Sequence, residues 1–238
     1  MRALFACVLM TAALAAPRPA AASTFDDECH AAMAPYYAAL LTSARGDADG
    51  TLRHLVALKG RWARVQALPA AERPAWTTQA SGSLLDLVAS RIEGARARTV
   101  ARNIVGAHAE LESIRALLRD ARARAGIRTF DDAVTDFHEA MERLTGRAGL
   151  HNEIALNADD YSAIEAHVER AAEAWAEIDR TAGPVKAATA WPGISGSTGT
   201  ILAKLRTATS ARDMGTTQLA SEELKARYFD LLAVLARG

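Results

Sequence analysis

Two short segments of this chain carry the same pattern of potential metal ligands. His30-Ala31-Ala32-Met33 and His138-Glu139-Ala140-Met141 both have the form His-x-Ala-Met. Residues three apart lie on one side of a helix, so the imidazole and the thioether of each segment can reach a common point. Imidazole suits copper, and thioether and thiolate groups favour its cuprous state. Each segment is therefore a candidate for part of a copper site.

Three further residues could complete such a site. Cys29 precedes His30 and would add a thiolate, whereas His54 and His167 occupy matched positions 113 residues apart. The predicted metal set is therefore Cys29, His30, Met33, His54, His138, Met141 and His167. The alternative is that each methionine fills the core and each histidine lies at its edge, because methionine at helical spacing is usually a packing residue.

Catalytic motifs do not accompany these residues. His138-Glu139 is followed by Ala140, Met141 and Glu142, so the His-Glu-x-x-His pair of zinc proteases is missing. A Gly-x-Ser-x-Gly elbow, a phosphate-binding loop ending in Gly-Lys-Ser/Thr and the Glu-x-x-His pairs of di-iron bundles are also absent from the sequence. We therefore predict a protein that is not an enzyme, with no catalytic residue and no organic cofactor.

An internal repeat sets the elements that must position these groups. Similar or identical residues recur 113 positions apart in the pairs His54/His167, Trp62/Trp175, Val65/Ile178, Leu111/Leu224 and Leu118/Leu231. Thr24-Phe25-Asp26-Asp27 also returns unchanged as residues 129–132. Such self-similarity predicts two related units, which we place at residues 23–128 and 129–238.

Apolar periodicity indicates helices in both units. Thr51, Leu55, Leu58, Trp62 and Val65 advance by four, three, four and three residues, and Ile164, Val168, Ala171, Trp175 and Ile178 take the same steps. Eight helices follow, at 26–44, 49–68, 82–102, 104–126, 130–147, 159–182, 198–212 and 216–236. Short connections favour antiparallel neighbours, so the predicted fold is all-α with two tandem antiparallel four-helix bundles. One continuous eight-helix array is the alternative.

The repeat does not align every motif. Thr-Phe-Asp-Asp recurs at an offset of 105 residues, but His-x-Ala-Met recurs at 108, so at least one of these matches is expected to be chance. Pro35 also follows Met33 with no counterpart in the second unit, where Arg143 stands. Because proline starts or kinks a helix, two equal metal sites are not expected.

The first residues have the three regions of an export signal. Arg2 is followed by the uncharged apolar run 4–16, and Ala20-Ala21-Ala22 offers small residues for cleavage. We expect residues 1–22 to be removed and the mature protein to be periplasmic or secreted. Because the apolar run is shorter than the ~20 residues that span a bilayer, no membrane insertion is expected.

Charge and cysteine content limit the classes of binding partner that the sequence predicts. The chain has 28 basic and 28 acidic residues, which gives no reason to expect a nucleic-acid partner. Arginines concentrate in residues 91–128 and acids in residues 131–179, which predicts either an anion-binding face or two helix faces that attract each other. With Cys7 removed, Cys29 remains as a metal ligand, an intermolecular disulfide partner or a tolerated buried thiol.

The layout resembles the exported four-helix-bundle cytochromes and their haem-less relatives. Ala211-Arg212-Asp213-Met214-Gly215 leads into the last helix through a glycine turn of the kind these bundles have. The resemblance implies an exported helical bundle. The covalent haem motif Cys-x-x-Cys-His is absent, and Tyr228-Phe229-Asp230 stands where the non-covalent version has a histidine, so haem is not implied.

These observations lead to two hypotheses of function. The first is an exported, non-catalytic helical protein that binds a partner or a small ligand, including a soft metal such as copper at the His and Met positions. The alternative is a purely structural or interaction protein without a ligand, dimerised through Cys29.

Overall fold

Helices dominate the computed structural model, which describes residues 24–79, 82–149 and 156–237. This part of the chain contains α1 (Phe25–Ala44), α2 (Ala48–Ala67), α3 (Leu84–Val100), α4 (Ile104–Arg124), α5 (Phe130–Gly149), α6 (Ala158–Thr181), α7 (Trp191–Ser210) and α8 (Met214–Leu235). The all-α prediction is confirmed. The predicted signal peptide lies outside the described residues.

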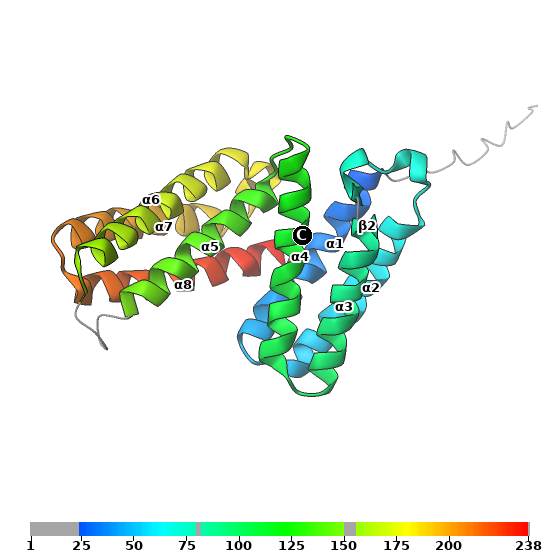
Figure 1. The fold of residues 1–238 in the computed structure, drawn as a ribbon, viewed down its shortest axis with the longest axis horizontal. Coiled ribbons are helices and arrows are strands. Elements are labelled where there is room, and N and C mark those ends of the chain that lie inside the picture. Colours follow the sequence, from blue (N-terminus) through cyan, green and yellow to red (C-terminus); the bar gives the residue numbers. More distant parts are fainter. Residues whose placement is uncertain (1–23, 80–81, 150–155, 238) are drawn as a thin grey trace, which may run out of the picture.

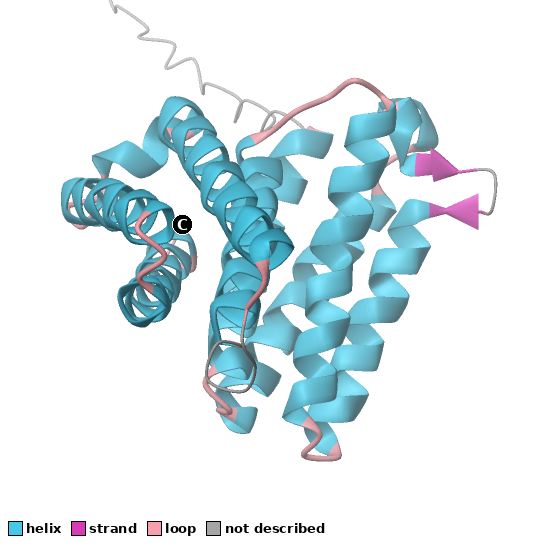
Figure 2. Cartoon of the chain, turned by 60° about the vertical axis from the view of Figure 1, so that its left-hand side comes forward, coloured by secondary structure: helices cyan, strands magenta, loops and turns pink. Residues whose placement is uncertain are grey.

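The helices pack as two groups of four, the α1–α4 group and the α5–α8 group. Within each group every helix packs on the next, and the last helix returns to the first, so α4 contacts α1 and α8 contacts α5. Figure 1 shows the two groups side by side, with the helices of one group running crosswise to those of the other. In Figure 2 part of the α5–α8 group is seen nearly end-on. The groups meet where α1 packs on α8 and α4 on α5.

One hydrophobic core runs through both groups. The predicted apolar seams of α2 and α6 are buried at all ten positions, from Thr51 to Val65 and from Ile164 to Ile178. The two matched pairs of leucines on α4 and α8 are buried as well. A single cluster of buried side chains includes residues of all eight described helices. The division into separate domains at 23–128 and 129–238 therefore stays a prediction.

Side-chain caps start the helices where the sequence places Thr, Asp or Asn. Thr24 caps α1 and forms a capping box with Asp27, and Thr129 and Asp132 exchange the same bonds at the start of α5. Of the two repeated motifs that disagree by three residues, Thr-Phe-Asp-Asp is thus the one that aligns helix starts. On this alignment Met33 corresponds to His138 and Tyr36 to Met141, since both pairs are 105 residues apart.

Three of the helix connections share one turn. Gly46, Arg102 and Arg212 adopt positive φ angles of 74°, 59° and 55°, and each is followed directly by the N-cap of the next helix. The residue after each positive φ also donates a backbone hydrogen bond to the carbonyl five residues earlier, which closes the preceding helix. These turns hold α1–α2, α3–α4 and α7–α8 as tight antiparallel pairs.

One helix start was predicted inaccurately. α7 begins at Trp191, seven residues before the predicted start at 198, because Pro192 falls in the first turn, where its missing N–H costs nothing, and buried Trp191 stacks on Trp175. α1 agrees with the predicted range 26–44 and contains Pro35 in its interior. A two-residue antiparallel pair, β1 (Thr78–Gln79) with β2 (Gly82–Ser83), precedes α3, and short 3₁₀ turns lie at Ala70–Glu72 (η1), Ala75–Thr77 (η2) and Gly183–Ala187 (η4).

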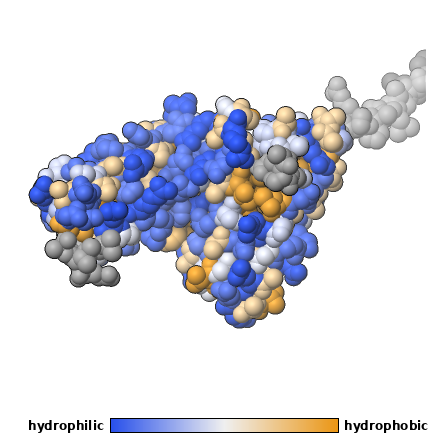
Figure 3. Space-filling model, in the orientation of Figure 1, coloured by the Kyte–Doolittle hydropathy of each residue, from blue (hydrophilic) through white to orange (hydrophobic). Residues whose placement is uncertain are grey.

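The surface differs between the groups. Hydrophobic residues gather over the α1–α4 group in the view of Figure 3, whereas the α5–α8 group is mostly hydrophilic there. Val56, Leu87, Val100 and Val105 are exposed on α2, α3 and α4, and Leu219 is exposed on α8. No helix in the described part of the chain has the length and hydropathy needed to cross a bilayer.

Candidate functional site

A large cavity lies at the junction of the two helix groups. Its volume is about 880 Å³, and its walls come from α1, the start of α5, the η4 segment and the end of α8. In Figure 1 the end of α8 lies between the groups, close to α1. Small-molecule sites in proteins are mostly cavities of roughly 300–1,000 Å³. The volume and position make this cavity the leading candidate for a binding site.

Most of the cavity wall is apolar. Met33 and Ala34 contribute from α1, Phe130 from α5, Val185 from η4, and Val234 and Leu235 from α8, with further alanines from residues 182–190. Such a surface favours a ligand with a hydrocarbon body, because apolar area leaves water on binding.

One polar pair lies in this apolar wall. The hydroxyl of Tyr37 on α1 donates to the Oδ1 atom of Asp131 on α5 at 2.5 Å. Tyr37 is almost fully buried, and burial and the neighbouring Asp131 raise its pKa well above the usual value. Burial also raises the pKa of Asp131, although its hydrogen bond with Tyr37 and the positive charge of Arg122 oppose the rise. The pair therefore joins the two groups and places one carboxyl group at the cavity.

The carboxylate of the next residue, Asp132, is neutralised by an arginine. Asp132 is 1% exposed and accepts hydrogen bonds from Nε and Nη2 of Arg122 on α4. The guanidinium of Arg122 lies 5.8 Å from the ring centre of Trp76, which itself packs edge-on against Phe25. This set fixes the start of α5 against the α1–α4 group and so fixes the wall that carries Asp131.

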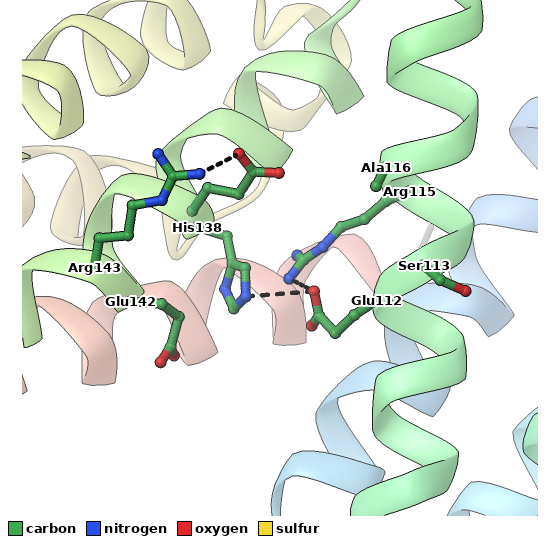
Figure 4. Close-up of a pocket in the computed structure, with 8 residues that line it drawn as sticks. Glu112, Ser113, Arg115, Ala116, His138, Glu142 and Arg143 are labelled. Carbon is green, nitrogen blue, oxygen red and sulfur yellow. Dashed lines mark hydrogen bonds and ion pairs between the residues drawn. The ribbon is translucent and has the colours of Figure 1, made fainter. Parts of the chain in front are cut away.

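A second polar cluster lies beside a smaller cleft between α4 and α5 (Figure 4). Glu112 on α4 is its centre. Its Oε1 lies 3.2 Å from Nε2 of His108, its Oε2 lies 3.3 Å from Nε2 of His138, and Arg115 pairs with the same carboxylate. Arg115 also donates to the hydroxyl of Tyr228 on α8 at 2.5 Å. The cluster thus ties α4 to both α5 and α8.

His138 has an unusual place in this cluster. Its Nδ1 atom is buried and has no hydrogen-bond partner among the described residues. Burial and the charge of Arg115 lower its pKa to about 3, although the charge of Glu142 opposes the shift. The imidazole is therefore neutral in the folded protein at pH 7. We interpret the cluster as a buried network that holds the two groups together.

Two of the predicted metal ligands meet at the large cavity. His30 and Met33, on α1, both line it. The two residues of the matching segment do not share a site, because His138 faces Glu112 whereas Met141 is fully buried in the core. His54 lies on α2, and His167 lies on α6 with its Nδ1 atom 2.6 Å from Arg170. Within the described residues no group of three or more His, Cys, Asp or Glu side chains is arranged to hold a metal.

Cys29 precedes His30 on α1 and packs, half-buried, against the core. Burial raises the pKa of its thiol to about 12, and the charge of Asp26 adds to this. A thiol of this kind carries almost no thiolate at neutral pH and is a slow partner in disulfide exchange. This environment gives no support to a dimer linked through Cys29, which stays a prediction.

Sequence reasoning missed Tyr37, Glu112, Arg115, Asp131 and Tyr228. A signal existed for Arg115, because a charged residue stands between Leu111 and Leu118 on the buried face of its helix. Asp131 had no signal, since the same letter in the first copy of its motif, Asp26, is exposed. What distinguishes Asp131 is its hydrogen bond with Tyr37 of α1 across the junction of the two groups, which the sequence pattern does not specify.

No family model matches this chain, and no curated protein or solved structure resembles it closely enough to be matched. The function is therefore argued from the cavity and its residues.

Proposed function

We propose that this protein is an exported, non-catalytic binding protein, and that the cavity between its two helix groups holds a small ligand. The observation that carries the proposal is the cavity of about 880 Å³ with a mostly apolar wall and one partly buried polar pair. The cavity needs residues from both groups, which gives the tandem arrangement a role in binding. The proposal of export rests on the sequence of residues 1–22.

Filling the cavity tests this proposal. Ala188, half-buried, lies in the loop before α7 and lines the cavity, so Ala188→Trp adds an indole there without altering a helix. Ala203→Trp is the matched control, because Ala203 is an exposed residue of α7 that does not line the cavity. The probe is N-phenyl-1-naphthylamine, an uncharged dye that fluoresces in apolar surroundings.

The expected result is saturable binding of about one dye per wild-type chain. Ala188→Trp is expected to weaken this binding at least tenfold, a loss of about 1.4 kcal/mol, whereas Ala203→Trp is expected to bind like the wild type. Failure of the wild type to bind the dye saturably, or equal binding by Ala188→Trp, would show that the cavity is not the ligand site.

A soft metal is the second occupant that one observation favours, since His30 and Met33 share the cavity wall. Elemental analysis and the ultraviolet–visible spectrum of the purified mature protein test this version. Copper near one atom per chain that is lost in both His30→Ala and Met33→Leu would support it. Absence of copper together with no uptake of added cuprous ion would exclude it.

A further inference from the structure

The two adjacent acids at the start of α5 have unequal partners. Asp132 is paired with Arg122 through two guanidinium nitrogens. The carboxylate of Asp131 accepts a hydrogen bond from the uncharged hydroxyl of Tyr37. Among the described residues no Lys, Arg or His nitrogen lies within 4.0 Å of a carboxylate oxygen of Asp131, whereas Asp132 has such a partner at 2.5 Å. Among the described residues, no positive side chain is thus in direct contact with the carboxylate that Asp131 brings to the cavity wall.

This difference is not a general property of the repeated motif. Asp26 is the residue that corresponds to Asp131 in the first copy of Thr-Phe-Asp-Asp, and it is exposed to solvent. A carboxylate in water needs no partner, but one held in a largely apolar cavity is costly unless it is neutralised. Burial accordingly raises the pKa of Asp131. A bound cation would remove this cost.

Other charged groups at the cavity lie at its margin. His30 on α1 and Arg237 after α8 both line the cavity, and both are exposed. The charges of Arg122 and His30 both act on Asp131 through their fields, but Nε and Nη2 of Arg122 are held by Asp132. Asp131 is therefore the only carboxylate among the described residues that line this cavity, and its hydrogen-bond partner Tyr37 orients it.

We propose that the ligand is an amphiphilic amine, whose ammonium group pairs with the carboxylate of Asp131 and whose hydrocarbon part lies against Met33, Phe130, Val185 and Leu235. This inference rests on the proposed function and adds the chemical class of the ligand. The ammonium group would donate a charge-assisted hydrogen bond in a site of low polarity, where such bonds are strong. The Tyr37 hydroxyl keeps one oxygen of Asp131 occupied and directs the ligand to the other.

Three ligands with one hydrocarbon tail and different head groups test the proposal. Octylamine, octanol and octanoate are titrated into the wild-type protein by calorimetry at pH 7. Octylamine is expected to bind at least tenfold more tightly than octanol, and octanoate is expected to bind most weakly. Asp131→Asn is expected to remove the preference for the amine while octanol affinity stays within about twofold.

Asp26→Asn is the matched control, because it makes the same change at the exposed copy of the motif and is expected to leave all three affinities unchanged. Equal binding of octylamine and octanol to the wild type, both blocked by Ala188→Trp, would overturn the amine class and leave the cavity as a binding site. Tighter binding of octanoate than of octylamine would also overturn the amine class. If octylamine does not bind saturably, the amine class fails, and binding of the dye to the wild type then decides whether the cavity is still a binding site. The comparison on the wild type needs no variant, so it decides the question even where Asp131→Asn is unstable.

Discussion

At the scale of single residues, the chemistry of this protein lies in groups whose sequence neighbours look ordinary. His138 was predicted as a metal ligand from its spacing to Met141, yet the two side chains enter different surroundings, a polar cluster and the core. His30 and Met33, predicted by the same rule, do share a cavity. Helical spacing identifies residues on one side of a helix, but the neighbouring helix decides what that side faces.

The buried imidazole of His138 should make the protein less stable in mild acid. Its pKa is about 3 in the folded protein, against 6.5 for an exposed histidine, so the unfolded chain binds more protons between these values. The contribution of His138 to the free energy of unfolding is therefore fully present above pH 6.5, and it is lost as the pH drops towards 3. Between pH 6.5 and 4.5 the expected loss from His138 is about 2 kcal/mol.

Urea unfolding of the wild type and of His138→Gln at several pH values measures this effect. The difference between the two stability curves is expected to shrink as the pH falls through this window, because glutamine does not titrate. His108, whose pKa is also lowered by burial, is present in both proteins and cancels. Parallel curves would mean that His138 is accessible to protons in the folded state.

At the scale of elements, much of the structure could be predicted from the sequence. The apolar steps along α2 and α6 located their buried faces, and the Thr-Phe-Asp-Asp copies marked the starts of α1 and α5. α7 was placed too late because Pro192 and the glycines around it were interpreted as a loop. Its first turn is held by the stacking of Trp191 on Trp175, a contact between helices that local propensity does not contain.

The buried pair of Asp132 and Arg122 is expected to fix α5 against α4. Asp132→Asn would keep a hydrogen-bonding side chain near the N-cap but leave Arg122 without its counter-charge, and Arg122 is 13% exposed. Breaking one partner of a buried pair costs about 3 kcal/mol or more. Chemical unfolding of this variant measures the loss.

Asp27→Asn provides the comparison for that change, because Asp27 has the same capping role in α1 but is exposed and pairs with no arginine in the described part of the chain. Its effect is expected to be much the smaller of the two. Similar losses in both variants would show that capping, and not the ion pair with Arg122, gives Asp132 its importance.

At the scale of the whole molecule, the candidate site is a product of the junction between the helix groups. Its walls combine α1 from the first group with α5, η4 and α8 from the second, and the Tyr37–Asp131, Arg122–Asp132 and Arg115–Tyr228 contacts cross the same junction. The uneven charge of residues 91–128 and 131–179 is explained in part by ion pairs here, including those of Arg119 with Asp136 and Glu139.

The sequence could not predict this cavity, because periodicity describes how each helix packs and not how two groups are placed. The residues that form it are mostly alanines and single apolar side chains from residues 30–37, 129–131, 181–190 and 234–237. Apart from His30 and Met33, which the sequence pattern marked as candidate metal ligands, none of them stands out in its own segment. Their common property is position in three dimensions.

A crystal structure with a bromine-labelled amphiphile tests the central claim most directly. We predict that 8-bromooctylamine gives one strong anomalous bromine peak inside the cavity near Val185 and Leu235, with its amine within hydrogen-bond distance of Asp131. A bromine peak on another surface, or an empty cavity in crystals grown at a saturating concentration of the ligand, would contradict the claim that the junction of the two helix groups is a binding site.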